Sequence, residues 1–295
     1  MNEAQLHKIG HGAGFLAALD QSGGSTPKAL ALYGVPETAY ATEAAMFELM
    51  HEFRSRIITA PAFTGERILG AILFEQTMNR DVDGVPTPRY LWERKNVVPF
   101  VKVDEGLAAE ADGVRPMKPF TELDGLLKSA VDRGVFGTKM RSFILRADAR
   151  GIATVLDQQF AYARQILDAG LTPILEPEVD ITSAAKQEAE ELLKQGILER
   201  LPGVPDGLRV MLKLSIPTVD DFYADLIAHP KVLRVVALSG GYSRKEADAR
   251  LAANHGLIAS FSRALTEGLF RQQSDEEFDR VLATSIAAIY AASTT

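Results

Sequence analysis

The chain has 295 residues, of which 46% are apolar and 24% are charged, and its formal net charge is −7. This composition excludes a disordered chain, and a negative chain without a dense basic stretch argues against nucleic acid as a partner. The lack of cysteine excludes disulfides, thiolate metal ligands and cysteine nucleophiles.

The N-terminal sequence lacks the basic and then apolar pattern of a signal peptide. No apolar run approaches the ~18–20 residues that span a bilayer. We therefore expect a soluble, cytoplasmic protein without a membrane partner.

Short apolar runs alternate with longer amphipathic segments, which is typical of a parallel sheet with crossover helices. Segments 38–53, 152–169 and 183–194 are predicted helices, and the last two are expected to end at Gly170 and Gly196. Ser243 with Glu246 and Ser274 with Glu277 have the spacing of capping boxes. The predicted strands are residues 14–19, 68–74, 97–103, 138–144, 171–175, 208–214, 232–238 and 257–261.

Eight strands alternating with helices predict one α/β domain over residues 1–295, a (β/α)8 TIM barrel with an N-terminal extension and a C-terminal helix. A doubly wound open sheet is the alternative, and it usually carries a glycine-rich phosphate loop directly after a strand. The nearest such segment, residues 10–14, precedes the first predicted strand, which favours the barrel.

Charged or phosphate-binding residues occur at seven of the eight predicted strand ends, which meet at one rim of a barrel. Residues at i and i+2 share a face of a strand, so Lys139 and Arg141 are expected to point the same way, as are Glu176 and Glu178 at the end of the fifth strand. In chain order the residues are Asp20, Lys102 and Asp104, Lys139 and Arg141, Glu176 and Glu178, Lys213, Ser239-Gly240-Gly241, and Ser262-Arg263.

Each of these features alone has an ordinary structural explanation. Lys213 could extend its ammonium into water at a strand end, the two glutamates could be solvated, and Ser239-Gly240-Gly241 could be a plain turn. Their occurrence together at one rim favours a catalytic site.

A metal site has no support in the sequence. The five histidines lack metal-ligand spacing, and without cysteine a structural zinc site is not expected. The segment 81–84 is similar to part of a calcium loop, but no glutamate occupies the twelfth position, so it is interpreted as a tight turn.

Lys213 interrupts the apolar segment 210–214, and burial there would favour its uncharged form. Lys139 is the expected cationic neighbour, whose repulsion acts in the same direction. A neutral amine attacks a ketone to form an imine, while carboxylates move the protons. Because a glycine turn beside an arginine suits a phosphate dianion, the sequence predicts a Schiff-base lyase acting on a phosphorylated ketose.

Three motifs, Glu176-Pro177-Glu178, Leu212-Lys213 and Ser239-Gly240-Gly241, follow Lys139-Met140-Arg141 in an order and spacing that are specific. Through them the chain resembles the class I (Schiff-base) fructose-bisphosphate aldolases of the short bacterial type, from about residue 14 to residue 265. The resemblance implies reversible cleavage of fructose 1,6-bisphosphate to dihydroxyacetone phosphate and glyceraldehyde 3-phosphate in glycolysis and gluconeogenesis, with no metal or other cofactor.

The resemblance also implies roles for individual residues. Lys213 would form the imine, Glu176 would handle the carbinolamine with support from Glu178, Lys139 would balance charge, and Asp20 would accept the C4 hydroxyl proton. The implied substrate-binding residues are Ser239, Gly240, Gly241, Ser262 and Arg263 at one phosphate, and Ser22, Ser25, Lys28, Lys102 and Arg141 at the other.

The chain departs from the animal aldolase pattern at several positions. Gln21 stands where a glutamate is common, and Ser262 replaces a glycine of the phosphate turn. Met140 replaces a tryptophan, and Leu214-Ser215 replaces a Pro-Asn pair. Tyr290 falls in a predicted helix and is not expected to act as the C-terminal tyrosine of the animal enzymes.

Two alternatives differ in their expected features. A transaldolase or deoxyribose-phosphate aldolase needs no second phosphate site, and a sugar-phosphate binding protein without turnover is expected to lack Lys213 or Glu176. The oligomeric state stays open between a monomer and a homo-oligomer.

Overall fold

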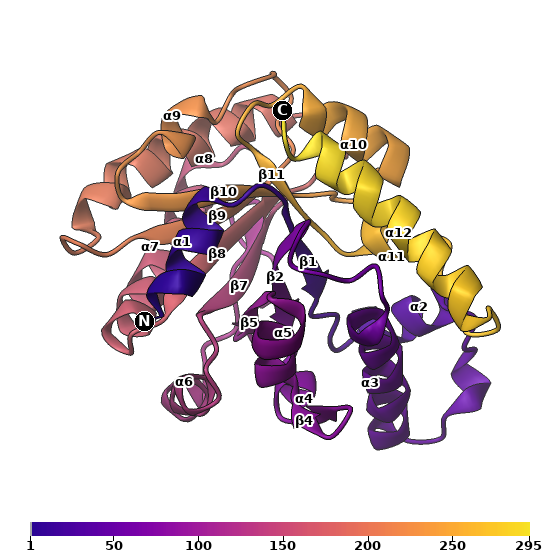
Figure 1. Cartoon of the computed structure of the whole chain (residues 1–295). Coiled ribbons are helices and arrows are strands. Elements are labelled where there is room, and N and C mark those ends of the chain that lie inside the picture. The colour runs from indigo at the N-terminus through magenta and orange to yellow at the C-terminus, as the bar shows by residue number, and fades with distance from the viewer. Residues whose placement is uncertain (1) are drawn as a thin grey trace.

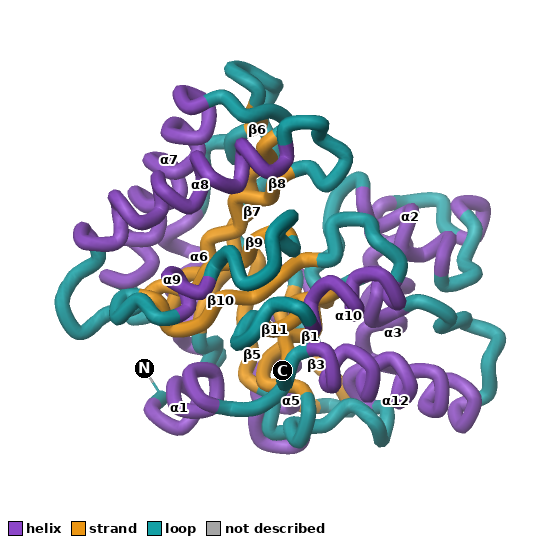
Figure 2. The backbone as a smooth tube through the Cα atoms, turned by 90° about the horizontal axis from the view of Figure 1, so that it is seen from above, coloured by secondary structure: helices purple, strands orange, loops and turns teal. Residues whose placement is uncertain are grey.

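A computed structural model of the chain describes residues 2–295. Its centre is a closed barrel of parallel strands, because each strand pairs with its neighbours and the first pairs with the last. The predicted TIM barrel is therefore confirmed, and Figure 2 shows the strands in the middle with helices around them. The barrel strands are β1 (Phe15–Leu19), β2 (Ile68–Leu73), β5 (Val98–Lys102), β7 (Gly137–Ile144), β8 (Thr172–Val179), β9 (Val210–Ser215), β10 (Val232–Leu238) and β11 (Ile258–Phe261).

Helices follow most of the strands and cover the outside of the barrel (Figure 1). The longer ones are α1 (Glu3–His11), α2 (Ser25–Leu32), α3 (Glu43–Thr59), α5 (Thr87–Lys95), α6 (Leu123–Asp132), α7 (Ala149–Asp168), α8 (Lys186–Arg200), α10 (Arg244–Ala252) and α12 (Asp275–Ala292). Shorter helical segments are α4 (Glu75–Met78), α9 (Ala224–Ile227), α11 (Arg263–Thr266), η1 (Glu37–Ala39) and η2 (Leu201–Gly203). No helix within residues 2–295 is both long and apolar enough to cross a membrane.

Three short strands lie outside the barrel, and the sequence did not predict them. β3 (Asp81–Val82) and β4 (Val85–Pro86) form an antiparallel hairpin, and its turn is the tight turn expected at residues 81–84. β6 (Val114–Arg115) pairs antiparallel with the end of β7. This pairing brings a segment from the long connection between β5 and α6 to the rim of the barrel.

Three predicted boundaries were wrong. The fifth strand, β8, continues through both glutamates to Val179, because the adjacent β7 pairs with it as far as that residue. The helix predicted over residues 38–53 is divided into η1 and α3, and α3 begins after the cap residue Thr42. Gly196 lies inside α8 and does not end it. Helix packing explains the glycine, since a Cβ there would lie 2.6 Å from the Leu156 side chain of α7.

Both predicted N-terminal caps are present, although only one is a complete box. Ser274 and Glu277 bond each other's backbone reciprocally at the start of α12. Ser243 caps α10 by accepting from the Glu246 backbone N–H. The predicted helix over residues 152–169 corresponds to α7, which is followed by Gly170 with φ of 82°.

The core has two layers, because alternate residues of each strand point to opposite sides of the barrel wall. One layer fills the space between barrel and helices. The other fills the interior of the barrel toward the amino-terminal ends of the strands, where Phe100 packs with Ile174 and Met211. Gly137 makes this packing possible, since a Cβ there would lie 2.9 Å from the Phe100 ring and 2.2 Å from the Thr172 carbonyl oxygen.

Helix α1 closes the amino-terminal end of the barrel. Its Ile9 belongs to the inner core layer, and the helix packs against β2, β5 and β10. Arg234 of β10 donates to the carbonyl oxygens of Ile9 and Gly12, at 3.0 and 2.9 Å. The opposite, carboxyl-terminal end is left for polar side chains.

Candidate active site

Strand alternation places Lys213 inside the barrel. Leu212 and Leu214 of β9 point outward to the helices, whereas Met211 points inward to the apolar layer. Lys213 shares the inward face with Met211, one step closer to the carboxyl end. Its side chain is only 5% exposed, so the alternative of an ammonium in open water at a strand end is wrong.

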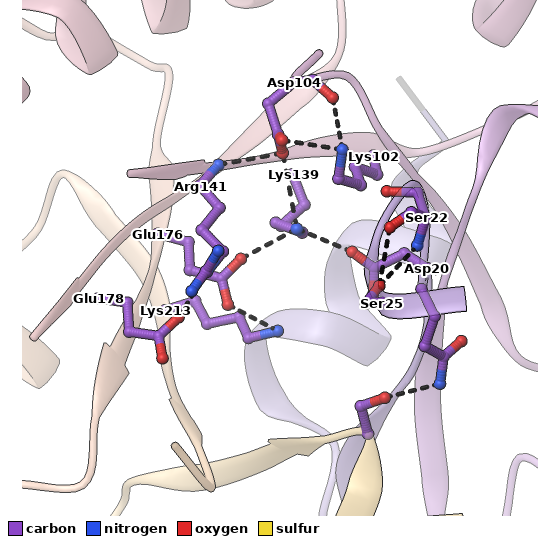
Figure 3. A network of polar contacts seen from close by, with 12 residues as sticks. Asp20, Ser22, Ser25, Lys102, Asp104, Lys139, Arg141, Glu176, Glu178 and Lys213 are labelled. Atoms are coloured by element: carbon purple, nitrogen blue, oxygen red, sulfur yellow. Dashed lines mark hydrogen bonds and ion pairs between the residues drawn. The ribbon is translucent and has the colours of Figure 1, made fainter. Parts of the chain in front are cut away.

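Glu176 contacts two lysines at once. Its Oε1 lies 3.0 Å from Lys213 Nζ, and its Oε2 lies 3.0 Å from Lys139 Nζ (Figure 3). All three side chains are buried. The sequence predicted that Lys139 is a cationic neighbour of Lys213 and repels it. In the structure the Glu176 carboxylate lies between the two lysines, because β8 carries Glu176 into the space between β7 and β9.

Lys139 is surrounded by carboxylates. Besides Glu176, its Nζ lies 2.7 Å from Asp20 Oδ2 and 3.7 Å from Asp104 Oδ2. Burial opposes the charge of Lys139, but Asp20, Glu176 and Asp104 together raise its pKa above the ordinary value. Burial likewise opposes ionisation of Asp20, yet Lys139 and Lys213 lower the Asp20 pKa. At neutral pH, Lys139 is therefore a cation and Asp20 an anion.

Arg141 and Glu178 form a second pair beside this cluster. Arg141 Nε lies 2.5 Å from Glu178 Oε2. Burial raises the pKa of Glu178 and the nearby Glu176 adds to the effect, whereas Arg141 opposes it. On this face of β8 Glu176 is buried and the Glu178 side chain is only 12% exposed, so the alternative of a solvated strand end is wrong.

Asp104 belongs to the site, although the sequence placed it at the rim without indicating a role for it. Its Oδ1 lies 2.8 Å from Lys102 Nζ, and its Oδ2 accepts a hydrogen bond of 3.2 Å from the Arg141 backbone N–H. The signal was present in the sequence, since Asp104 follows Lys102 by two residues at a strand end. Lys102 also donates to the Asp104 backbone carbonyl, so this lysine is turned toward the rim of the cluster.

A cavity of about 700 Å³ opens at this end of the barrel. It is lined by all the predicted site residues except Gly241. Those lining it are Asp20, Ser22, Ser25, Lys28, Lys102, Lys139, Arg141, Glu176, Glu178, Lys213, Ser239, Gly240, Ser262 and Arg263. Within residues 2–295, no group of three or more His, Asp or Glu side chains is arranged to hold a metal ion.

The Ser-Gly-Gly turn after β10 depends on its glycines. Gly240 has φ of 61° and Gly241 has φ of 125°, which are conformations that other residues rarely adopt. A Cβ on Gly240 would also lie 2.5 Å from Ile181. Although Gly241 does not line the cavity, its backbone is close to the Arg263 guanidinium, and a Cβ there would lie 3.7 Å from Nη2.

The residues around the start of α2 line the other side of the cavity. The Ser25 hydroxyl accepts from the Ser22 N–H at 3.0 Å and donates to the Ser22 carbonyl at 2.8 Å, so it is already used within this turn. Lys28 lies one helical turn further on. Arg115 of β6 also lines the cavity, and the sequence did not mark it because only the β6–β7 pairing brings it there.

Two further polar residues were missed as functional candidates. Gln21 Nε2 donates to Ser262 Oγ at 2.7 Å, and both residues line the cavity. Behind them, Arg54 of α3 is 1% exposed and donates to the Gln21 carbonyl. A single arginine in an amphipathic helix carries no sequence signal of such a contact.

Comparison with known proteins supplies the family. The family model of class I fructose-bisphosphate aldolases matches residues 3–198. A protein named fructose-bisphosphate aldolase class 1 from Synechocystis sp. is 58% identical over 294 residues, covering 100% of this chain and 98% of the relative. One with the same name from Clostridium acetobutylicum is 56% identical, and each chain is covered in full.

The fold is also that of solved aldolase structures. The fructose-bisphosphate aldolase of Plasmodium falciparum superposes with a TM-score of 0.73 at 22% identity, over 98% of this chain and 92% of that one. This likeness supports the barrel, and the sequence relatives support the chemistry of its rim. The chain belongs to the class I fructose-bisphosphate aldolase family.

Proposed function

We propose that this protein reversibly cleaves fructose 1,6-bisphosphate to dihydroxyacetone phosphate and glyceraldehyde 3-phosphate through an imine on Lys213. The observation that carries the proposal is the buried pairing of Lys213 Nζ with Glu176 Oε1, at 3.0 Å, beside the cavity. The relatives at 56% and 58% identity that bear the aldolase name support the choice of substrate.

Glu176 is in reach to carry protons in both directions. It accepts a proton from Lys213, and the neutral amine then attacks the C2 carbonyl of the substrate. The carboxyl group returns the proton to the carbinolamine oxygen, which leaves as water, and the imine forms. Lys139, on the other oxygen of Glu176, keeps this carboxylate oriented throughout.

Asp20 is placed for the cleavage step. As an anion it accepts the C4 hydroxyl proton while the C3–C4 bond breaks and glyceraldehyde 3-phosphate leaves. The bonding electrons move toward the protonated imine, which becomes an enamine. Protonation of that enamine at C3 and hydrolysis release dihydroxyacetone phosphate and regenerate the Lys213 amine.

The two phosphates would bind on opposite sides of this cluster. Ser239, Gly240, Gly241, Ser262 and Arg263 offer hydroxyl, backbone N–H and guanidinium donors for one. Ser22, Ser25, Lys28, Lys102 and Arg141 were predicted for the other. Since Lys102 and Arg141 are paired with carboxylates, Lys28 and Arg115 carry most of the available positive charge there.

Borohydride trapping tests the imine. Reduction in the presence of dihydroxyacetone phosphate is expected to leave an adduct on Lys213, located by mass spectrometry of the digested protein. Lys213→Met should abolish the adduct, whereas Lys245→Met, on an exposed position of α10, should not change it. An adduct on another lysine, or none, would refute the mechanism.

Two further assays separate this reaction from its alternatives. Full activity in EDTA is expected, and loss of activity would indicate a metal-dependent aldolase. Turnover of a singly phosphorylated ketose should be much slower than that of the bisphosphate, and equal turnover would contradict the second phosphate site. We place the activity in cytoplasmic glycolysis and gluconeogenesis.

A further inference from the structure

The loops after β1 and β11 are joined by the Gln21–Ser262 hydrogen bond. Gln21 follows Asp20 directly, and Ser262 precedes Arg263 directly. The bond therefore links the loop that carries the proposed proton acceptor, Asp20, to the loop that carries the proposed phosphate ligand, Arg263. The direct contact between Gln21 and Ser262 indicates that the two residues act as a pair.

Arg54 determines the orientation of the Gln21 side-chain amide. Its Nη2 donates to the Gln21 backbone carbonyl and lies 3.4 Å from Oε1, and its Nη1 donates to Thr77 Oγ1 at 2.8 Å. A guanidinium has donors and no acceptor, so only the amide oxygen can face it. The amide NH2 group must then face Ser262.

The cost of burying Arg54 supports a role beyond packing. The side chain is 1% exposed and has no carboxylate within ion-pair distance among residues 2–295. Burial lowers its pKa to about 9, although nearby Asp20 opposes this shift, so it remains a cation at neutral pH. A buried charge without an ion pair is costly, and its hydrogen bonds go mainly to Gln21 and Thr77.

The orientation of Gln21 leaves one donor unused. Ser262 Oγ accepts the hydrogen bond from Gln21, and among residues 2–295 its own O–H has no hydrogen-bond acceptor. The hydroxyl lines the cavity beside Arg263. Its proton is therefore available to an anion held by Ser239, Gly240 and Arg263.

We propose that Arg54, Gln21 and Ser262 form a one-way chain of donors that directs the Ser262 hydroxyl proton to a substrate phosphate oxygen. The inference rests on the proposed function, because it deepens one of that site's two phosphate contacts. Each member donates to the next, and a phosphate dianion, which only accepts, ends the chain. Gln21 and Arg54 are positioning residues, and Ser262 is the residue that touches the ligand.

A carboxylate at position 21 would reverse the last two links. A carboxylate has no donor, so it would accept one hydrogen bond from Arg54 and another from the Ser262 hydroxyl. A lone pair of Ser262 Oγ, and not its proton, would then face the phosphate. Gln21→Glu is expected to raise KM for fructose 1,6-bisphosphate and Ki for inorganic phosphate about tenfold, with kcat changed by about twofold or less. The neutral variant Gln21→Met should raise both constants by a smaller factor, and Gln187→Glu on the exposed face of α8 should change neither.

A double-mutant cycle separates the donor chain from simple charge repulsion. In a Ser262→Ala background, Gln21→Glu should have much less effect on KM than in the unaltered protein, since no hydroxyl proton remains to be redirected. Equal effects in both backgrounds, or no effect of Gln21→Met, would overturn the proposal. Thermal unfolding of each variant shows whether it is folded.

The trapping experiment distinguishes failure of the donor-chain proposal from failure of the proposed function. If borohydride labels Lys213 in the unaltered protein and the cycle is additive, only the donor chain is wrong. If Lys213 is not labelled, the function itself is wrong. Inhibition by inorganic phosphate reads the anion site directly and is independent of the imine chemistry.

Discussion

Glu176 Oε1 lies 3.0 Å from Lys213 Nζ, and both groups are buried inside the barrel toward its carboxyl-terminal end. This contact gives Lys213 a proton acceptor before a substrate arrives. Because Lys139 occupies the other oxygen, the carboxylate cannot rotate away without losing an ion pair. Glu176 is therefore held in one orientation between the two lysines.

Glu176→Gln should remove the proton carrier while keeping the shape of the site. We expect kcat for bisphosphate cleavage to fall by about a hundredfold or more, as for the loss of a general acid–base group. The rate of borohydride labelling at Lys213 should fall with it. Glu199→Gln, on the exposed side of α8, is the control. A kcat within about threefold of the unaltered protein would exclude Glu176 as the proton carrier.

Lys139→Met should destabilise the fold as well as the site. It removes the shared cation from the buried Asp104 and Glu176 and from the largely buried Asp20, which costs about 3–5 kcal/mol for a broken buried ion pair. The loss should be smaller at pH 5 than at pH 8, because the carboxylates can then take up protons instead. Urea unfolding at both pH values measures this. Lys128→Met, which removes an exposed pair with Asp132, should cost less than about 1 kcal/mol.

Asp248 of α10 should make stability fall with rising pH. Burial raises its pKa to about 6, and its Oδ1 has no hydrogen-bond partner among residues 2–295. A carboxyl whose pKa is higher in the folded protein binds more protons folded than unfolded, so stability decreases from pH 4 to about pH 6 and stays lower above it.

Replacing this half-exposed group should therefore stabilise the protein at neutral pH. We expect Asp248→Asn to gain roughly 1 kcal/mol at pH 7, after allowance for solvent screening, and the gain should vanish near pH 3.5. Asp220→Asn, at an exposed position outside the helices, is the matched control. A gain that is the same at both pH values would contradict the assignment to Asp248.

Gly137→Ala should damage the barrel interior. The added methyl group would lie 2.2 Å from the Thr172 carbonyl oxygen, which belongs to the adjacent strand and cannot rotate away. Overpacking of this kind costs about 1–3 kcal/mol or more. Gly125→Ala, within α6 and with no atom within 4 Å of its Cβ, should stabilise by up to about 1 kcal/mol. Denaturant unfolding of the two variants gives the comparison, and equal stabilities would contradict it.

Local patterns were sufficient to predict the barrel and most of its rim. Eight apolar runs correspond to the eight barrel strands, because burial on both faces requires continuous apolar sequence. The i and i+2 spacing placed Lys139 with Arg141 and Glu176 with Glu178, since strand alternation is a property of the backbone. Chain order alone could not show that Glu176 lies between two lysines.

What the sequence by itself determined was the set of barrel strands and the face on which each polar side chain at the rim lies, because both follow from short-range geometry. Only the tertiary structure decided that Lys213 is paired rather than solvated, that Asp104 belongs to the cluster, and that Arg54 reaches Gln21. These contacts join residues from different strands and helices, and their partners are chosen by barrel closure and packing. Gly196 is a further example. In the sequence it is typical of a helix end, but only the packing of α7 against α8 shows that it is needed inside the helix.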